Sequence, residues 1–578
     1  MKKIFITGIG FFLLTIGFVK AQTVATGIND VYSERFQSAK ATFEKLIAAN
    51  PNDIDAIYWL GQTYLEMDDP NGAAGVYSKG LASSSNAPLL QAGMGQVELV
   101  QNKINEARQH FEAAVTATAG KKGGDPAVLN AVGRAITEVY TDKDKKGDIN
   151  YAVQKLEEAS QSKTKDNALL ADIYVNLGNA YLKAKPGENG GPAFTSYQKA
   201  TENNPNFALA YYRMAQLFKT QKNWELYEKY LNDAIAKDPR FAPAYYDLAY
   251  FKMGKLDLAA AEQYAGKFAG AADTDPQNDY LRGSILYVKK DYDQALGVGQ
   301  SIISRLGDKT KARVYRLMAY STMDKKDTAN AKQYIDTYFQ KAKPEEITAL
   351  DYSLKANIYS AIPGQEDVVF TSYLDGLKAD TVLDNKIDLL KQGSKFFADR
   401  KQYEKEAQLE LRLMTLKPTL TINDYFAPGL ALYRTKTDSG YIRSYNIFKT
   451  VSEKFPDQTF GWEWMYNNAI VIDTVKRDSI AVPAAMALLK FAQTDTAKYA
   501  KQISNASYYL ATYYLEVKKD KDKAIEYLRM MQAASKDEAT KQSIEKNIQL
   551  LLNPPRQQQQ PAKTGAPRGN TQGSPKPR

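Results

Sequence analysis

The sequence predicts an all-α solenoid, built of about a dozen helix-turn-helix hairpins that stack on one another. Two observations lead to this fold class. The chain repeats itself, because NPNFALAYYRMA at residues 204–215 returns as DPRFAPAYYDLA at residues 238–249, one step of 34 residues later. Within each step, apolar residues recur at spacings of three and four, the period of an amphipathic helix. A fixed period of roughly 20–50 residues is typical of repeat architectures.

Prolines mark the ends of the repeated units, because proline lacks the backbone N–H that a continuing helix needs. Their separations are 37, 38, 79, 34, 37, 68, 74 and 38 residues, which are single or double steps of one unit. The markers are Pro51, Pro88, Pro126, Pro205, Pro239, Pro276, Pro344, Pro418 and Pro456. Each unit reads as two amphipathic helices, and neither helix can bury its apolar stripe alone. Neighbouring hairpins must therefore stack.

Small and large apolar residues alternate at fixed places in these units. In residues 54–87 the pattern is carried by Ile57, Leu60, Gly61, Tyr64, Ala73, Tyr77 and Gly80. It returns at Tyr174, Leu177, Gly178, Tyr181, Ala193, Tyr197, Ala200 and Pro205, and more weakly at Trp462, Met465, Leu510, Ala511 and Tyr514. The pattern resembles the tetratricopeptide repeat (TPR). The resemblance covers roughly residues 25–550, is weakest between 345 and 455, and implies a right-handed superhelix of hairpins.

The domain organisation follows from the repeat and from its ends. We expect a signal peptide at residues 1–21, an N-terminal array at 22–343, a degenerate C-terminal array at 344–553 and a disordered basic tail rich in Pro and Gln at 554–578. The segment 536–552 is predicted to be a final capping helix. The first unit looks incomplete, because AKATFEKLIAANP supplies a second helix with little room for a first. Insertions at 120–126, 141–150 and 185–192 are predicted to be loops.

Residues 1–21 resemble a secretory signal, with Lys2 and Lys3 before an apolar stretch and Val19-Lys20-Ala21 as a cleavage site. Cleavage before Gln22 is expected, which would leave no transmembrane segment; an uncleaved anchor is the alternative. The chain has no Cys, so export to an oxidising compartment would break no thiol chemistry. We therefore expect an exported protein that is periplasmic, associated with the outer membrane, or extracellular.

The net charge of +10 is not distributed like that of a nucleic-acid-binding protein. Without the three lysines of the signal segment and the five basic residues of the tail, the body carries a charge of only +2. No specific nucleic-acid partner is predicted, because such a partner requires basic clusters on the folded domain. The tail has two readings: contact with an anionic envelope polymer, or a solubilising end without a partner.

Catalytic and metal-binding motifs are weak. The only histidine, His110, has no cysteine or second histidine with which to build a metal site or a catalytic triad. The segment TDKDKKGD begins like a calcium loop, but Lys146 and Val153 occupy two ligand positions. Neither a cofactor nor an enzyme activity is predicted.

The resemblance does imply a binding face. In TPR proteins the first helix of each hairpin lines the concave side, and its second, fifth, ninth, twelfth and thirteenth positions point into the groove. Carried onto this chain, the groove residues are Tyr58, Gln62, Asn179, Lys183, Tyr212, Gln216, Lys219, Tyr246, Tyr250, Tyr508 and Thr512. Of the paired tyrosines at the repeated junction, Tyr211 and Tyr245 are expected to pack inside the array. Tyr212 and Tyr246 are expected to face the groove.

The leading hypothesis is a non-enzymatic scaffold of the bacterial cell envelope that binds a partner protein or peptide in this groove. Aromatic and amide side chains suit such recognition, because a tyrosine offers apolar area and one hydrogen-bonding group. The alternative is an enzyme-associated or glycan-binding module that acts on cell-wall or polysaccharide substrates. Packing of the same tyrosines against the next repeat would explain them without any partner.

Overall fold

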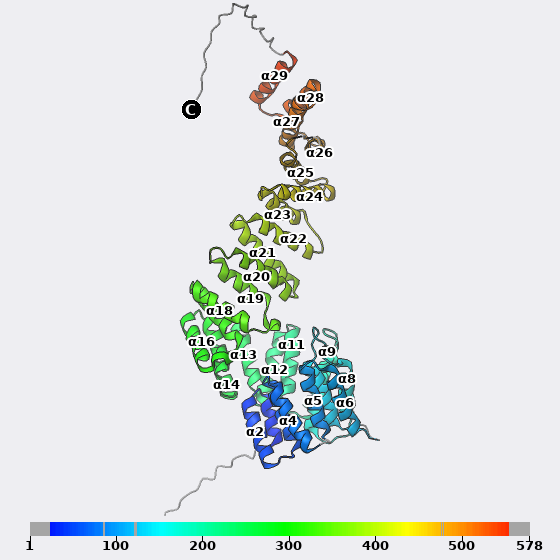
Figure 1. Cartoon of the computed structure of the whole chain (residues 1–578), viewed down its shortest axis with the longest axis vertical. Coiled ribbons are helices and arrows are strands. Elements are labelled where there is room, and N and C mark those ends of the chain that lie inside the picture. The colour runs from blue at the N-terminus through cyan, green and yellow to red at the C-terminus, as the bar shows by residue number, and fades with distance from the viewer. Residues whose placement is uncertain (1–22, 85–86, 121–123, 476, 478, 554–578) are drawn as a thin grey trace, which may run out of the picture. The chain divides into compact units, whose positions relative to one another are not determined.

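The computed structural model describes residues 23–84, 87–120, 124–475, 477 and 479–553. In these residues the chain forms 29 α-helices and three short 3₁₀ helices, and no β-strand. Figure 1 shows the α-helices following one another as antiparallel neighbours, which confirms the predicted all-α solenoid. The predicted signal segment and the basic tail lie outside the described residues.

The chain divides into two compact units between Ala342 and Lys343. The N-terminal unit contains nine helical hairpins, each made of a first and a second helix. Its helices are α1(Val24–Tyr32), α2(Phe36–Ala49), α3(Ile54–Glu66), α4(Pro70–Ser83), α5(Pro88–Val100), α6(Ile104–Thr118), α7(Pro126–Val139), α8(Ile149–Ser160), α9(Asn167–Ala184), α10(Gly190–Asn203), α11(Ala208–Thr220), α12(Trp224–Lys237), α13(Ala242–Gly254), α14(Leu258–Ala271), η1(Pro276–Asn278), α15(Asp279–Val288), α16(Tyr292–Leu306), η2(Gly307–Lys309), α17(Ala312–Asp324) and α18(Thr328–Lys341).

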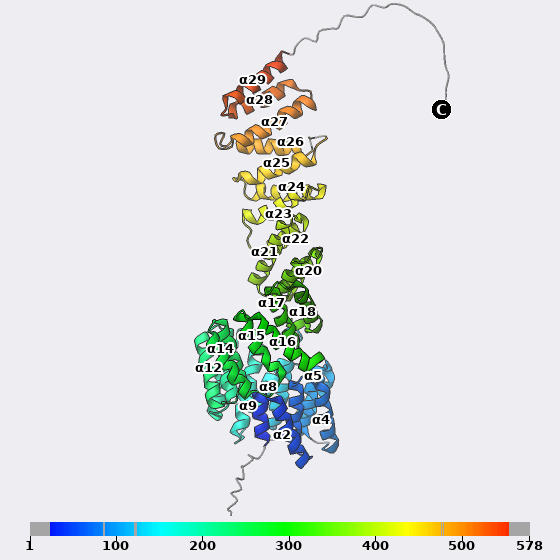
Figure 2. The ribbon, with the colours of Figure 1, turned by 90° about the vertical axis from the view of Figure 1, so that its left-hand side faces the viewer.

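The C-terminal unit contains five further hairpins and one last helix, and Figure 2 shows α25 to α29 stacked in chain order. Its helices are η3(Pro344–Glu346), α19(Ala349–Ser360), α20(Glu366–Ala379), α21(Leu383–Asp399), α22(Tyr403–Leu416), α23(Ile422–Arg434), α24(Asp438–Lys454), α25(Thr459–Ile472), α26(Ala481–Ala492), α27(Ala500–Glu516), α28(Lys521–Ala534) and α29(Glu538–Leu552). The region where the repeat pattern weakens is therefore helical as predicted, and α29 forms at the place expected of a capping helix.

Large side chains of second helices fill the space that glycines leave on first helices. Tyr77 of α4 is fully buried between Gly61 of α3 and Gly93 of α5. A Cβ atom added to Gly61 or to Gly93 would lie 2.1 Å or 2.5 Å from the Tyr77 ring. The Tyr77 hydroxyl donates to the Tyr58 carbonyl oxygen at 3.0 Å. The glycines of the repeat are thus the places where ring and helix backbone approach most closely.

The first aromatic residue of each repeated junction has a structural role. It donates a hydrogen bond to the carbonyl of the proline six residues before it, which ties the start of the new helix to the end of the previous unit. The pairs are Tyr211 and Pro205 at 3.2 Å, Tyr245 and Pro239 at 3.1 Å, and Trp462 Nε1 and Pro456 at 3.0 Å. Tyr245 is buried and Tyr211 is half-buried.

The first hairpin is complete, contrary to the expectation that the array begins with a lone second helix. Helix α1 is only nine residues long and starts at Val24. It is stabilised because Thr23 caps its N-terminus by accepting from the Thr26 amide at 3.2 Å. Its end buries Val31 and places the Tyr32 ring 5.7 Å from that of Trp59. A short first helix is enough, because it packs against α3 and not only against α2.

The N-terminal unit curves until its first hairpin contacts hairpins far along the chain. The Tyr32 ring lies 5.5 Å from the Phe207 ring at the start of α11. At the N-terminus of α2, the Asp273 carboxylate accepts from the Gln37 and Ser38 amides at 2.8 and 3.1 Å, and from the Ser38 hydroxyl at 2.5 Å. Helix α2 has no side-chain cap of its own, since Arg35 stands at its N-cap position. Asp273 supplies the cap from the end of α14.

Replacing Asp273 with alanine should loosen the start of a helix that lies 235 residues away in the sequence. The change removes the acceptor for two backbone N–H groups, and the loss of a helix cap costs about 0.5–2 kcal/mol. Hydrogen exchange should become faster at the amides of residues 37–40. In the control variant Asp53→Ala, which removes the local cap of α3, exchange should rise at residues 54–57 instead. Unchanged exchange at residues 37–40 in the Asp273 variant would contradict the long-range cap.

A buried carboxylic acid in the C-terminal unit makes stability depend on pH. Glu406 of α22 is only 7% exposed, and its Oε2 atom has no hydrogen-bond partner among the described residues. Burial raises the pKa of Glu406 to about 7; Arg434 opposes the shift and Glu410 adds to it. The folded state therefore holds this proton more tightly than the unfolded state. Its stabilising effect is complete below about pH 4.5 and is lost as the pH rises towards 7.

The Glu406→Gln variant should be less sensitive to pH than the parent chain. The stability of the variant relative to the parent should increase by about 2 kcal/mol between pH 5 and pH 8, because glutamine does not ionise. Denaturant unfolding followed by circular dichroism at the two pH values measures this difference. The control is Glu453→Gln, which changes an exposed carboxylate of α24. Equal behaviour of the two variants would show that burial of Glu406 has no energetic effect.

Candidate functional site

A polar pocket of about 190 Å³ lies inside the N-terminal unit. Most of the helices that line it are first helices of their hairpins, namely α1, α3, α7, α9, α11 and α13. The turn after α1 and Phe36, at the start of the second helix α2, complete the lining. The lining residues are Val31, Tyr32, Glu34, Phe36, Trp59, Gln62, Glu66, Arg134, Glu138, Val175, Asn176, Asn179, Leu209, Tyr212, Arg213 and Pro243. First helices thus form the inner face of the unit.

One wall of the pocket is a buried ionic cluster around Asp172, which we call the Asp172 cluster. The carboxylate of Asp172 accepts from Arg134 and Asn130 at 2.6 Å each and from the Tyr32 hydroxyl at 2.5 Å. Asn176 joins it by donating to Asp172 at 3.3 Å and to the Asn130 side chain at 2.9 Å. Burial and the neighbouring Asp172 charge raise the pKa of Tyr32. Three first helices, α1, α7 and α9, meet in this cluster.

Arg134 also packs on an aromatic ring. Its guanidinium carbon lies 4.5 Å from the centre of the Trp59 ring, and only 5% of the residue is exposed. Stacking of this kind is strongest for a guanidinium that has lost its water. The Nε atom of Arg134 has no hydrogen-bond partner among the described residues. Arg134 is therefore fixed in position, and its Nε donor is buried without a partner among the described residues.

A second chain of polar contacts, which we call the glutamine ladder, runs along α3, α5 and α7. The amide of Gln62 donates to the Tyr77 hydroxyl at 2.9 Å and to Gln96 at 2.8 Å. Gln96 in turn donates to Glu138 at 2.6 Å. The ladder links the floor of the pocket to the core, because Tyr77 is the ring that separates α3 from α5.

The open part of the pocket carries three carboxylates and one arginine. Glu34, Glu66 and Glu138 are exposed to the pocket, and Arg213 is half-buried beside them. Enclosure by protein raises the pKa of Glu66 to about 7, and the charges of Glu138 and Glu34 raise it further while Arg213 opposes them. Enclosure also raises the pKa values of Glu34 and Glu138. When all three carboxyl groups are ionised, their formal negative charge exceeds the positive charge of Arg213.

The structure brings together three of the predicted groove residues. Gln62, Asn179 and Tyr212 all line the pocket. Asn179 is fixed by the Tyr197 hydroxyl, which donates to it at 2.8 Å. The ring of Tyr212 lies 5.4 Å from the Phe241 ring and is half-buried. One face of each residue is thus held by the core and another faces the pocket.

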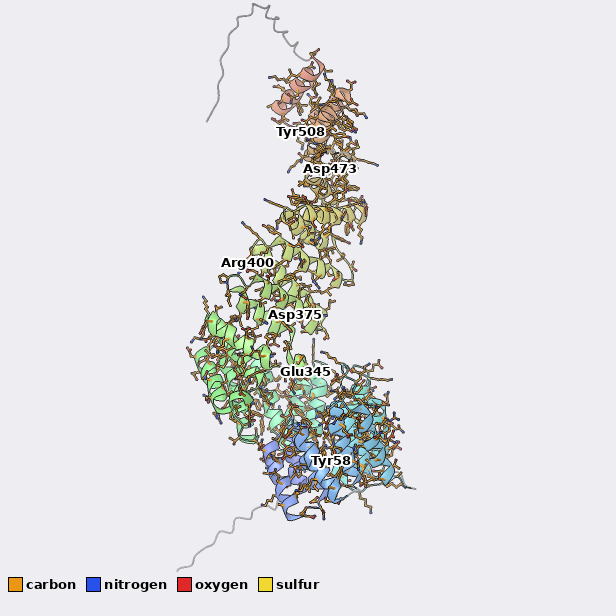
Figure 3. All side chains as sticks on the ribbon, viewed as in Figure 1. Tyr58, Glu345, Asp375, Arg400, Asp473 and Tyr508 are labelled. Carbon is orange, nitrogen blue, oxygen red and sulfur yellow. The ribbon has the colours of Figure 1, made fainter. Side chains whose placement is uncertain are left out.

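Tyr58 and Lys183, which were also predicted to face the groove, serve the core and a helix end instead. Tyr58 is 2% exposed, with its ring 5.6 Å from that of Trp59. Figure 3 shows it among the helices of the N-terminal unit. The Lys183 ammonium group donates to the backbone carbonyls of Thr137 and Tyr140 at 2.5 and 2.9 Å, at the C-terminal end of α7. It satisfies carbonyls that the helix leaves unpaired.

The other predicted residues of the N-terminal unit form a neighbouring group around Asp247 of α13. Gln216 donates to the Asp247 carboxylate at 2.5 Å, and Lys219 lies 3.7 Å from it. The rings of Tyr246 and Tyr250 contact each other with centres 4.7 Å apart. Both tyrosines are half-buried. The group extends the polar inner face beyond the pocket.

Tyr508 and Thr512 belong to the C-terminal unit, on α27. Tyr508 is 60% exposed, and Thr512 donates to the backbone carbonyl of Tyr508 at 3.0 Å. Figure 3 labels Tyr508 in this unit. These two residues are not part of the pocket of the N-terminal unit, whose lining comes from residues 31–243.

Sequence reasoning missed the charged residues that dominate the pocket: Glu34, Glu66, Arg134, Glu138, Asp172 and Arg213. A signal for three of them was present. Arg134 follows Gly133 in the same way as Gln62 follows Gly61, and Glu138 then matches Glu66 four residues further on. Applying the same helix positions to residues 126–139 would have found Arg134 and Glu138. Glu34 lies in a turn, for which the repeat positions give no rule.

The arrangement is suited to binding. It offers fixed hydrogen-bond donors and acceptors, an indole ring and an excess of carboxylates on a rigid set of helices. Among the described residues, no helix is both long and apolar enough to cross a membrane.

Comparisons with known proteins find repeat proteins. Residues 33–114 match the family model described as anaphase-promoting complex, cyclosome, subunit 3. A curated relative, Tetratricopeptide repeat protein 1 of Schizosaccharomyces pombe, is 29% identical over 89 residues, which are 14% of this chain and 9% of that protein. The chain therefore matches only about a tenth of the length of this relative.

Solved structures that are similar to this chain include other repeat proteins at low identity. The C-terminal part of a TPR repeat-containing protein from Cytophaga hutchinsonii is 20% identical, covering 45% of this chain and 97% of that one, with a TM-score of 0.25. A TPR protein from Parabacteroides merdae is 17% identical, covering 46% and 98%, with a TM-score of 0.37. Yeast Tom70 is 13% identical, covering 71% and 94%, with a TM-score of 0.36.

The hairpins observed in the chain carry the argument, together with the matched segment. Fourteen helix pairs follow one another in the described residues, and in several of them a glycine of the first helix receives a large side chain of the second, as Gly27 receives Phe43, Gly61 receives Tyr77 and Gly95 receives Phe111. The family match, residues 33–114, runs from α2 into α6 of these pairs. Together they give the chain the fold of a solenoid of tetratricopeptide-repeat hairpins.

Proposed function

We propose that the chain is a non-enzymatic scaffold of the bacterial cell envelope, which binds a partner protein or peptide on the inner face of its N-terminal unit. The observation that carries the binding part is the pocket lined mainly by first helices, in which the side chains of Glu34 and Glu66 have no hydrogen-bond or ion-pair partner among the described residues. Repeat arrays present such a face as one continuous surface. The envelope location rests on the predicted signal segment and on the absence of cysteine.

The binding face can be tested by site-specific crosslinking in the native envelope. A photoreactive amino acid is placed at Asn179 in the pocket and, as the matched control, at Gln198 on the exposed side of α10. Mass spectrometry should recover the same protein partner at Asn179 in repeated experiments and not at Gln198. If neither position recovers a partner above background, the scaffold proposal is wrong.

The location has its own test. Edman sequencing of the protein from an envelope fraction should begin at Gln22, the residue after the predicted cleavage site. Recovery of the protein in the cytosolic fraction with residues 1–21 intact would contradict export while leaving the binding face untouched.

A further inference from the structure

The geometry points to the class of group that the pocket takes: the cationic side chain, Lys or Arg, of an extended peptide segment. This inference deepens the proposed function and rests on it. It assigns the carboxylates to the cationic side chain, and the amide and guanidinium donors to the peptide backbone.

Two of the three pocket carboxylates have no hydrogen-bond donor among the described residues. Neither Glu34 nor Glu66 makes a side-chain hydrogen bond or an ion pair with any described residue, and Glu138 accepts only from the neutral Gln96. Three carboxylates in one pocket repel each other, which is costly unless a cation joins them. A lysine ammonium has three donors and an arginine guanidinium has five, so either can engage several carboxylates at once.

Two arginines of the pocket lining have an N–H group without an acceptor among the described residues. The Nε atoms of Arg134 and Arg213 have no hydrogen-bond partner among the described residues, although both residues line the pocket. Arg134 is nine-tenths buried and held by Asp172, so it is already in place before a ligand arrives. An isolated cation would leave such donors unused. The carbonyl oxygens of an extended peptide would supply acceptors beside the same carboxylates.

The charge and the size of the pocket also fit one long cationic side chain. Lys311 and Arg313 act on Glu34, and Lys183 acts on Glu138, from outside the lining. Within the lining, Asp172 offsets Arg134, so Arg213 alone faces the formal charges of Glu34, Glu66 and Glu138. The surplus is negative. A volume of about 190 Å³ holds one long side chain with its backbone, and not a folded domain. The Trp59 ring in the wall adds an apolar surface for the methylene groups of that side chain.

The pH dependence of binding follows from the groups around Glu66. These are Glu34 from the turn after α1, Arg134 and Glu138 from α7, and Arg213 from α11. A cation stabilises ionised Glu66, so binding releases the proton that Glu66 holds below about pH 7. Affinity should therefore rise by up to about tenfold between pH 6 and pH 8.

The experiment uses the full chain and fluorescein-labelled decapeptides of Ala and Ser that carry three lysines at alternate positions, with fluorescence anisotropy as the readout. The matched probe carries acetyl-lysine at the same positions, which keeps the length and removes the charge. The lysine peptide should bind at least tenfold more tightly than the acetyl-lysine peptide. The variant Glu66→Gln/Glu138→Gln should lose at least tenfold in affinity and lose the dependence on pH.

The control variant is Glu202→Gln/Glu225→Gln, which makes the same change of net charge on exposed positions of the second helices α10 and α12. Its affinity should stay within twofold of the parent. An equal loss in both variants would overturn the inference. It would mean that the peptide responds to the net charge of the whole protein and not to the carboxylates of the pocket. If the double pocket variant does not fold, Glu66→Gln alone suffices, since Glu66 makes no hydrogen bond with its side chain in the structure.

Further outcomes separate this inference from the proposed function. Equal binding of both peptides, or saturation of the pocket by putrescine at the affinity of the lysine peptide, would overturn the assignment of a peptide lysine. A partner captured at Asn179 together with no preference for lysine would refute the inference and leave the scaffold function standing. A lysine preference with no partner captured at Asn179 would refute the scaffold function. A deletion of residues 554–578 should leave lysine-peptide affinity unchanged; a gain in affinity would mean that the chain's own basic tail is the occupant.

Discussion

Replacing Arg134 with alanine should lower the stability of the N-terminal unit by about 3–5 kcal/mol, the usual loss when one partner of a buried ion pair is removed. The change leaves Asp172 as a buried charge without its cation, supported only by Asn130, Tyr32 and Asn176. It also removes the guanidinium that stacks on the Trp59 ring. Because the Asp172 cluster joins α1, α7 and α9, the loss should spread over several hairpins.

Denaturant unfolding and hydrogen exchange measure this effect, and the protein provides a matched control. Arg108 pairs with Glu112 at 2.8 Å, at nearly the same distance as the Arg134 pair, but both of its partners are largely exposed. Arg108→Ala should cost less than about 1 kcal/mol, because exposed ion pairs contribute little. The same small cost for both variants would show that the Asp172 cluster does not hold the unit together.

Replacing Tyr77 with alanine should cost about 3–5 kcal/mol, the range of a large aromatic side chain removed from a core. The ring separates α3 from α5, and its hydroxyl group is bonded to the Tyr58 carbonyl and to Gln62. The cavity would open directly beneath the glutamine ladder. The loss of stability should therefore be accompanied by faster hydrogen exchange in α3 and α5.

Two further variants serve as comparisons for Tyr77→Ala. Tyr77→Phe keeps the ring and removes only the hydroxyl, so it should cost about 1–2 kcal/mol. Tyr508→Ala, at an exposed site, should change stability by less than about 0.5 kcal/mol. Melting and denaturant curves for the three variants should fall in this order. A Tyr77→Ala variant as stable as Tyr508→Ala would contradict the role of the ring as a spacer.

The fold was predictable because its determinants are local. The proline markers, the period of 34 residues and the glycine that faces a ring all act within one hairpin or between adjacent ones. The use of first helices as the inner face was also predictable, and Gln62, Asn179 and Tyr212 lie where the repeat positions put them.

The composition of the pocket was not predictable to the same degree, because it depends on curvature. Each step between hairpins adds a small rotation, and only the sum brings Tyr32 beside Asp172 and Phe207. The sequence of a single repeat does not specify this summed rotation. Tyr58, whose position in the helix suggested exposure, is covered in the folded unit and contacts the rings of Trp59 and Tyr77. The role of Asp273 at a distant helix end follows from the same closure. Lys183, by contrast, contacts the end of α7 in the adjacent hairpin.

The cap that Asp273 provides for α2 changes how the array of hairpins is expected to unfold. An open row of repeats unfolds like a one-dimensional chain, in which each hairpin senses only its neighbours and the ends fray first. A contact between the first and the seventh hairpin converts that row into a loop, which has no free N-terminal end within its first turn. The hairpins of this turn should then exchange their amides as one cooperative unit, and α1, although short, should be no weaker than the helices between which it is held.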